Sequence, residues 1–211
     1  MVRKISILLV ASLVFFSFVN AGLVAAEKEK LTIALVSEPT TLDPHKQWNP
    51  SSYYVYRNIF DNMVTRNSDG KIVPQVAESW NYIDQKTIDF KIRTNIKFHD
   101  GSSLTVDDVV FSVKRVIDPK FKSPQAGQFN TITDAKKINK NTVRLFTKVP
   151  YPVLLAQLVK LSIVPKAYIN KVGNDGLNRN PVGSGPYKFV AWKKGVSVKL
   201  EANNQYWSGQ P

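Results

Sequence analysis

The residues of this chain that are suited to catalysis are few and widely separated. None of the 211 residues is a cysteine, and two are histidines, His45 and His99. The lack of thiols excludes disulfides, thiolate metal sites and cysteine nucleophiles. Neither histidine stands in a His-Glu-x-x-His pattern, so there is no zinc signature, and both are interpreted as loop residues that make ordinary hydrogen bonds.

Two further groups match catalytic motifs only in part. Asp107 and Asp108 are adjacent, but neighbouring side chains on a helix point about 100° apart, and acidic residues are favoured at a helix start. The run Gly183-Ser184-Gly185 lacks the spacing of a phosphate loop or a nucleophile elbow, so its glycines are interpreted as serving backbone geometry. The sequence therefore predicts a protein that is not an enzyme, with no catalytic residue, no metal site and no cofactor.

A polar loop that carries one tryptophan is the main candidate for binding. It consists of Gln47, Trp48, Asn49 and Pro50. The loop lies between the first predicted strand and the first predicted helix, where open α/β folds often place ligand contacts. A tryptophan at such a position serves packing as often as binding, and the sequence leaves both open.

Hydrophobic spacing and turn residues predict the elements that must position this loop. Apolar runs and period-two alternation indicate strands, and apolar residues every three or four positions indicate helices. Thr105 to Asp108 has a capping-box form, with Asp in place of Glu or Gln, at the start of the best-defined helix. The predicted strands are Leu31 to Val36, one through Ile88 to Ile92, Thr142 to Thr147, Tyr187 to Trp192 and Val196 to Leu200, with a strand pair around the turn Ser68 to Gly70; the predicted helices are Ser51 to Met63, Thr105 to Ile117 and one with Pro152 in its first turn that buries Leu154, Leu155 and Leu158.

The amino terminus has the form of a secretory signal. Arg3 and Lys4 precede an apolar run from Ile5 to Val19, and small residues follow up to Ala26. This order predicts export with cleavage after Ala26 or Ala21. Because no cysteine is present for lipidation, the expected product is periplasmic and not a lipoprotein.

The net charge of +13 arises from 29 basic and 16 acidic residues. Charges of both signs recur along the chain, and no segment interleaves arginine with aromatic residues, so nucleic acid is not predicted as a partner. An exported basic domain that binds anionic polymers or a membrane surface by charge is the alternative function.

Seven short motifs, taken together and in order, resemble the solute-binding proteins of peptide-type ABC importers, family 5, which includes oligopeptide-, dipeptide- and nickel-binding members. Each motif is weak alone, and the set is highly specific. The motifs are EPTTLDPH (38–45), VAESW (76–80), FKIR (90–93) leading to KFHDG (97–101), LTVDDVVF (104–111), IVPK (163–166), PVGSGPY (181–187) and NNQYW (203–207).

The resemblance implies an α/β fold of the periplasmic binding protein type II-like class. It implies an incomplete first lobe with an inserted α+β subdomain, and it implies that the second lobe is absent because the family continues well beyond this length. By the resemblance, residues 1–26 are the signal peptide, residues 27–60 and 181–211 form the main part of lobe I, and residues 61–180 form the inserted subdomain. The chain is accordingly expected to be a truncated fragment.

The resemblance also implies that the protein captures a peptide or a similar small molecule in the periplasm and delivers it to ABC permease subunits in the inner membrane. The loop Gln47 to Pro50 matches the position where relatives offer backbone hydrogen bonds to an extended peptide. A second position match, the segment Ser123 to Phe129, adds Gln125 and Phe129 as candidate ligand contacts.

Overall fold

The computed structural model describes residues 30–211, of which Leu35–Pro211 form one unit and the short segment up to Ala34 belongs to another. The predicted signal peptide, residues 1–26, lies outside the described residues. The predicted strand from Leu31 to Val36 is absent, because residues 30–36 have no regular structure and Leu31 is 83% exposed. A strand needs a neighbour for its backbone hydrogen bonds, and none of the strands among residues 30–211 pairs with this segment.

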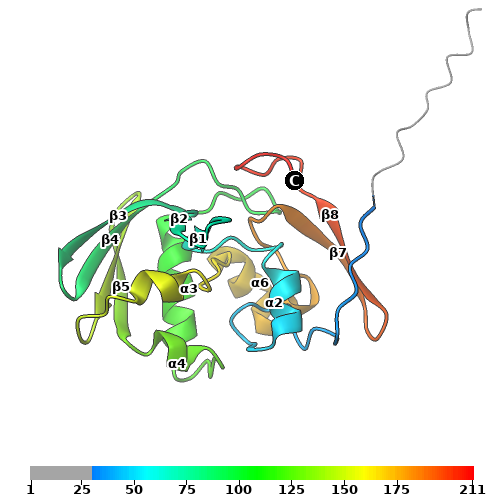
Figure 1. Ribbon diagram of the computed structural model, residues 1–211, viewed down its shortest axis with the longest axis horizontal. Helices are drawn as coiled ribbons and strands as arrows, with labels where there is room; N and C mark the ends of the chain where they lie inside the picture. Colours follow the sequence, from blue (N-terminus) through cyan, green and yellow to red (C-terminus); the bar gives the residue numbers. More distant parts are fainter. Residues whose placement is uncertain (1–29) are drawn as a thin grey trace, which may run out of the picture. The chain divides into compact units, whose positions relative to one another are not determined.

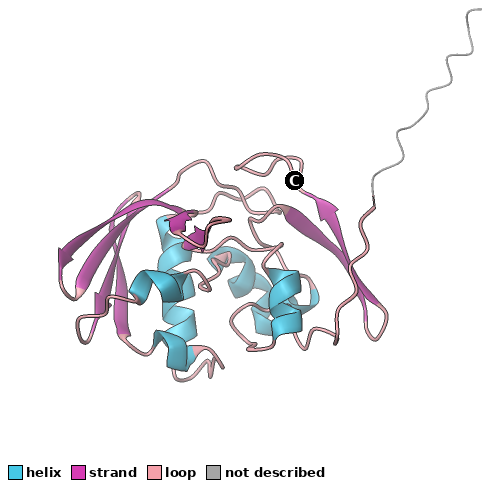
Figure 2. Ribbon diagram, viewed as in Figure 1, coloured by secondary structure: helices cyan, strands magenta, loops and turns pink. Residues whose placement is uncertain are grey.

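Helices and short antiparallel sheets alternate along the second unit (Figures 1 and 2). Most predicted strands are confirmed within one or two residues, whereas β3, α4, β5 and α6 have no counterpart in the prediction. The elements are α2 (Pro50–Tyr56), β1 (Val64–Arg66), β2 (Ile72–Pro74), β3 (Ala77–Asp84), β4 (Thr87–Ile92), α3 (Val106–Ile117), α4 (Ala126–Phe129), β5 (Ile132–Asn139), β6 (Thr142–Thr147), α5 (Leu154–Leu158), α6 (Lys166–Arg179), β7 (Tyr187–Lys193) and β8 (Ser197–Ala202).

A four-stranded antiparallel sheet in the order β3-β4-β6-β5 is the largest sheet of the described residues. Its register places Phe90 of β4 opposite Trp80 of β3 and Val143 of β6. Because side chains alternate between the two faces of a strand, Phe90 and Val143 point to the same buried face. Helix α3 packs on this face and contributes Val109 and Val113 to the same core (Figure 1).

Two hydrophobic clusters form the core of Leu35–Pro211. The larger cluster contains buried apolar side chains from residues 63–163, together with Val182. The smaller one contains buried apolar side chains from residues 42–60, together with Val164, Ile169 and Leu177. Strands β7 and β8 cover the smaller cluster with half-buried side chains such as Phe189. Helix α6 therefore packs with the segment around the candidate loop, although the predicted domain division assigns its residues to the inserted subdomain.

The first helix is shorter than its apolar spacing predicts, because α2 ends at Tyr56. After α2 the backbone leaves the helical path, and the N–H of Met63 donates to the Leu161 carbonyl at 3.1 Å. Similarly, α5 begins at Leu154, two residues after Pro152, and buries Leu154 and Leu158 but only part of Leu155. Among residues 30–211, no helix combines the length and the apolar character that crossing a bilayer requires.

Gly183 and Gly185 let two backbone segments approach closely, as the sequence predicts. The N–H of Gly185 donates to the carbonyl of Ile59 at 2.9 Å. A Cβ atom on Gly183 would lie 2.0 Å from that same carbonyl oxygen, and one on Gly185 would lie 2.7 Å from the Asn58 oxygen. The glycines are thus required by packing, because any side chain would collide with main chain.

Helix α3 begins with the predicted capping arrangement. Thr105 is the N-cap, and its backbone N–H donates to Oδ2 of Asp108 at 2.8 Å. Its hydroxyl donates to the same oxygen at 2.7 Å. Asp108 also accepts from the backbone N–H of Lys166 at 2.9 Å, so the cap joins α3 to the start of α6.

We expect Thr105→Ala to lower the free energy of unfolding by about 1 kcal/mol, because the substitution removes the N-cap hydroxyl. Thr105→Ser keeps a hydroxyl and should lower it by no more than a few tenths of a kcal/mol. Urea unfolding of the two variants and the parent protein measures the difference. Equal losses for alanine and serine would show that the hydroxyl has no capping role.

Candidate functional site

The loop from Gln47 to Pro50 is held in one conformation by its own side chains. Oε1 of Gln47 accepts from the N–H of Asn49 at 2.7 Å. Asn49 is the N-cap of α2, and its Oδ1 accepts from the N–H groups of Ser51 and Ser52 at 2.8 and 3.3 Å. Pro50 occupies the first position of α2, where a proline is well tolerated. Gln47 is buried by this arrangement, whereas Trp48 remains 58% exposed.

Gln125 supports the loop from inside. Its Nε2 donates to the carbonyls of Pro44 and Gln47 at 2.6 and 2.9 Å. Ser123 adds a hydrogen bond from its hydroxyl to the carbonyl of His45 at 2.6 Å. Gln125 is only 2% exposed, and its Oε1 makes no hydrogen bond within residues 30–211. The structure thus brings Gln125 to the candidate loop, with its side chain facing the loop's main chain, and its role as a ligand contact stays a prediction.

Phe129 is 1% exposed and belongs to the larger hydrophobic cluster. It lies at the end of α4, with its ring packed among the core side chains of the sheet and α3. The structure therefore does not bring Phe129 to the exposed surface of the loop. Its role as a ligand contact stays a prediction.

A buried ion pair anchors the segment that precedes the loop. Nη1 and Nη2 of Arg115 donate to Oδ1 and Oδ2 of Asp43 at 3.0 and 2.6 Å, and both side chains are almost fully buried. Nη2 also donates to Oδ1 of Asn174 on α6 at 2.7 Å, and the guanidinium lies 4.0 Å from the Phe121 ring centroid. The bidentate geometry and the additional partners compensate for the desolvation of both charges.

His45 completes this network. Its Nδ1 accepts from Nη1 of Arg115 at 3.0 Å, so the ring proton is assigned to Nε2, which donates to the carbonyl of Ser162 at 2.8 Å. Burial and the charge of Arg115 lower the pKa of His45 to about 4, against the opposing effect of Asp43. His45 is therefore neutral at pH 7. Burial also lowers the pKa of His99, whose Nε2 lies 3.0 Å from the Gly185 carbonyl. Both histidines make ordinary hydrogen bonds, as the sequence analysis predicts.

A second buried carboxylate, Asp61, joins distant segments of the chain. Four side chains donate to it: Gln75 at 2.9 Å, Ser184 at 2.9 Å, Tyr206 at 2.8 Å and Trp207 at 2.8 Å. Burial raises the pKa of Asp61, and the four donors oppose this effect by stabilising the ionised form. The polar residues of the motifs around Ser184 and Trp207 therefore hold the fold together.

Sequence reasoning missed both carboxylate networks. Arg115 lies between Val113 and Val116 on the apolar face of α3. A charged residue at a buried helical position was the one sign in the sequence that it has a buried partner. Asp43 precedes His45 by two residues in the first motif, but nothing in the spacing shows that Arg115 is their partner. Asp61 follows the apolar pair Ile59 and Phe60 without any pattern that marks a buried acid.

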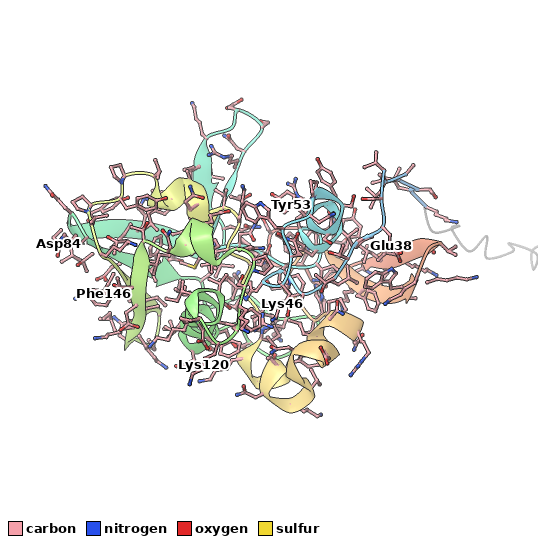
Figure 3. The ribbon with its side chains drawn as sticks, turned by 90° about the horizontal axis from the view of Figure 1, so that it is seen from below. Glu38, Lys46, Tyr53, Asp84, Lys120 and Phe146 are labelled. Atoms are coloured by element: carbon pink, nitrogen blue, oxygen red, sulfur yellow. The ribbon has the colours of Figure 1, made fainter. Side chains whose placement is uncertain are left out.

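The surroundings of Trp48 are basic. Nζ of Lys160 lies 5.3 Å from the Trp48 ring centroid. On the same loop, Nζ of Lys46 donates to the carbonyl of Phe121 at 2.7 Å (Figure 3). Neither the backbone N–H nor the backbone C=O of Trp48 makes a hydrogen bond within residues 30–211. The site therefore presents an aromatic face, the Lys160 ammonium beside it, and a free donor and acceptor of the main chain.

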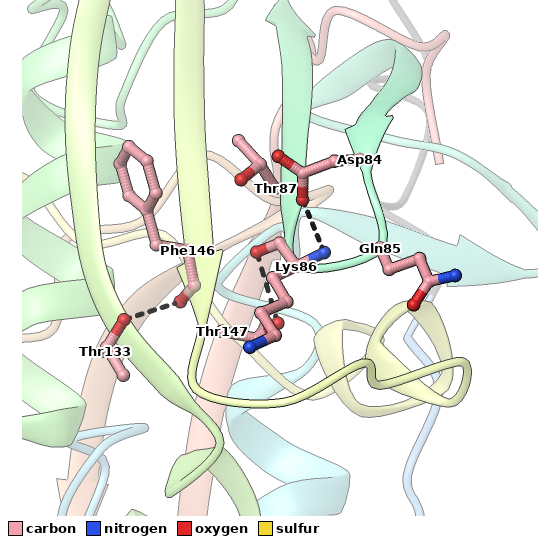
Figure 4. A pocket seen from close by; sticks show the side chains of 7 residues that line it. All are labelled: Asp84, Gln85, Lys86, Thr87, Thr133, Phe146 and Thr147. Carbon is pink, nitrogen blue, oxygen red and sulfur yellow. Dashed lines mark hydrogen bonds between the residues drawn. The ribbon is translucent and has the colours of Figure 1, made fainter.

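A depression of about 650 Å³ near the β3–β4 turn includes Asp84, Lys86 and Phe146 (Figure 4). The groups that line it bond to one another, since the N–H of Lys86 donates to Asp84 at 2.7 Å and Thr133 donates to the Phe146 carbonyl at 3.2 Å. Within residues 30–211 no cluster of three or more acidic or histidine side chains is arranged to hold a metal ion.

Comparisons with known proteins identify the family of this chain. The model of the family described as bacterial extracellular solute-binding proteins, family 5 Middle, matches residues 71–211. The periplasmic oligopeptide-binding protein OppA of Salmonella typhimurium is 32% identical over 220 residues, which cover 95% of this chain and 40% of OppA. Protein XP55 of Streptomyces lividans is 32% identical over 187 residues, covering 87% of this chain and 34% of its own length.

Solved structures have the same fold over most of this chain. The oligopeptide-binding protein AppA of Bacillus subtilis, in complex with a nonapeptide, has a TM-score of 0.79. The match has 28% identity and covers 84% of this chain and 37% of AppA. MoaA of A. tumefacien R10, in complex with mannopinic acid, has a TM-score of 0.75 and 34% identity over 82% of this chain and 36% of MoaA. The chain thus spans about 40% or less of the length of these relatives, and the matched part is an incomplete lobe of a periplasmic binding protein.

We expect the stability of the protein to fall as the pH drops, through His45. Its pKa is lowered to about 4 in the folded state from 6.5, so the unfolded state takes up the proton first. The contribution is fully present above about pH 6.5 and declines toward pH 4, by about 3 kcal/mol in total.

Urea unfolding at about pH 7.5 and about pH 4.5 measures this loss. His45→Gln does not titrate and should show a smaller change in unfolding free energy between the two conditions, by about 2 to 3 kcal/mol. Because His99 is present in both proteins, its titration cancels in the comparison. An identical pH dependence for the parent and the variant would contradict the assignment.

Proposed function

Because the chain belongs to the bacterial extracellular solute-binding proteins of family 5, we propose that it provides one wall of the peptide-binding site of an ABC importer's substrate-binding component. In this proposal the protein is exported to the periplasm, captures peptides and delivers them to permease subunits in the inner membrane. Its role is binding, with no catalysis. The named ligands of the relatives, among them a nonapeptide and mannopinic acid, support a site for small polar molecules that include peptides.

The single observation that carries the proposal is the loop around Trp48. An extended peptide is recognised through main-chain hydrogen bonds, with side-chain specificity added by neighbouring surfaces. Trp48 offers a free backbone N–H and C=O beside an exposed indole. The hydrogen bonds of Gln47, Asn49 and Gln125 fix the loop in advance, and a preorganised surface loses less conformational entropy when a ligand binds.

The proposed ligand contacts are Gln47, Trp48, Asn49 and Pro50, with Gln125 and Phe129 behind them. We assign the direct contact to Trp48 and Asn49, because Gln47, Gln125 and Phe129 are buried. Residues 61–180 are proposed to form the inserted subdomain, and residues 27–60 and 181–211 the main part of lobe I. Within the proposed subdomain, Val164, Ile169 and Leu177 pack in the cluster of residues 42–60.

The alternative function, binding of anionic polymers or membrane surface by charge, has a different dependence on salt. Binding that depends on many surface charges weakens steeply as ionic strength rises. Binding of a peptide through main-chain hydrogen bonds and an aromatic contact changes little. No observation on the described residues favours the alternative, since their positive charges are spread over many elements.

Calorimetric titration of the complete gene product with a mixed peptide library tests the proposal. We expect binding that persists at high salt and that Trp48→Ala weakens by roughly tenfold or more, because a buried aromatic contact contributes about 1.5 to 3 kcal/mol. Tyr82→Ala is the matched control, because Tyr82 is a similarly exposed aromatic on β3. The proposal fails if no peptide binds, if binding disappears at high salt, or if the two variants behave alike.

A further inference from the structure

We propose that Lys160 and Trp48 together form a subsite for a carboxylate of the ligand, which makes this protein selective for acidic peptides. This inference rests on the proposed function and adds a substrate class to it. The ligand group is a carboxylate that lies against the Lys160 ammonium, while the adjoining apolar part of the ligand packs on the indole of Trp48.

The two side chains come from segments far apart in sequence, and both backbones are fixed. Lys160 follows α5 directly, and its N–H donates to the carbonyl of Gln157 at 3.0 Å. Leu158 and Leu161, on either side of it, are completely buried. Trp48 is held by the bonds of the loop described above. The Lys160 ammonium and the Trp48 ring, 5.3 Å apart from Nζ to ring centroid, are therefore both carried by backbone segments with fixed positions.

The ammonium of Lys160 has no acidic partner within residues 30–211. Some exposed lysines of the described chain do have one, among them Lys91 with Glu78, Lys114 with Asp134 and Lys137 with Asp107. Lys160 instead faces an aromatic ring, which attracts a cation without using its N–H donors. The three donors of the ammonium stay available for a carboxylate.

One further cation belongs to a residue close to Trp48 in sequence. Lys46 lies two residues before Trp48, and its ammonium faces the Phe121 ring at 4.3 Å. Asp43 cannot offset these cations, because its carboxylate is buried and already paired with Arg115. Because the chain carries a net charge of +13, acidic ligands are also favoured in the encounter.

A purely structural pairing of Lys160 with Trp48 explains less. A cation–π contact at an exposed position contributes only about 0.5 to 1 kcal/mol. The indole remains more than half exposed with Lys160 in place, so most of its apolar surface is still open to a ligand. A bound carboxylate beside this ring would be partly desolvated, which strengthens its attraction to the ammonium.

The test uses the complete gene product and short alanine peptides in which Glu or Gln is placed at each position in turn, each with a free or an amidated carboxyl terminus. We expect one Glu peptide to bind about tenfold more tightly than its Gln counterpart, with a free and with an amidated terminus alike. A preference for free termini over amides without a difference between Glu and Gln would identify the terminal carboxylate as the partner of Lys160 and would overturn the proposed selectivity for acidic peptides.

Lys160→Gln should abolish that preference while binding of the neutral peptides changes less than about twofold. Lys160→Glu should reverse it, so that peptides with Lys in place of Glu bind more tightly. Lys140→Gln, in the turn between β5 and β6, is the control and should leave the preference unchanged.

Equal binding of acidic and neutral peptides by the parent protein, or a preference that survives Lys160→Gln, would overturn this inference while leaving the proposed function intact. Failure of the proposed function is seen separately, as no binding of any peptide in either the acidic or the neutral set. In that case the proposed carboxylate subsite is rejected together with the proposed function.

Discussion

The ion pair between Arg115 and Asp43 is the interaction on which the candidate site depends. Burying a guanidinium is costly, and the cost is offset only when its donors are paired with good geometry. Here the donors reach Asp43, His45 and Asn174, which places the segment before the loop, helix α3 and helix α6 around a single charge. Removing Asp43 would leave a buried cation, so these segments hold their relative positions as a unit. The loop that presents Trp48 begins two residues after His45, and its conformation follows from this anchor.

The network of Asp61 has the same role for other segments of the unit Leu35–Pro211. Its donors come from the segments around Gln75, Ser184 and Tyr206 to Trp207. The two networks are linked, since His45 donates to the Ser162 carbonyl and the hydroxyl of Ser162 donates to Asn62, next to Asp61. Several residues of the sequence motifs, among them Asp43, His45, Ser184 and Trp207, therefore fix backbone segments in a polar interior. The residue proposed to meet the ligand, Trp48, lies outside every one of those motifs.

Local patterns in the sequence were sufficient where a single segment determines its own structure. The alternation of Ile88, Phe90 and Ile92 and the cap at Thr105 correctly predicted β4 and α3, because side-chain period and capping chemistry are local. Strand β5 was missed because Lys136 and Lys137 interrupt its apolar alternation at the sheet edge. The segment from Leu31 to Val36 was predicted as a strand because composition indicates a strand but does not show which neighbour pairs with it. The candidate loop was located from its tryptophan and its place in the chain, whereas its support by Gln125 and Arg115 depends on contacts more than 65 residues apart in sequence, which spacing alone does not reveal.

A crystal structure of the complete gene product with a bound peptide tests the central claim most directly. That claim is that the loop Gln47 to Pro50, held by the network of Arg115, Asp43 and His45, contacts the ligand through Trp48. The account predicts that the backbone N–H or C=O of Trp48 lies about 2.7 to 3.2 Å from a main-chain atom of the peptide, with the ion pair of Arg115 and Asp43 unchanged. A peptide that binds without touching residues 47–50, or a loop that reaches it only after that ion pair has separated, would contradict the account.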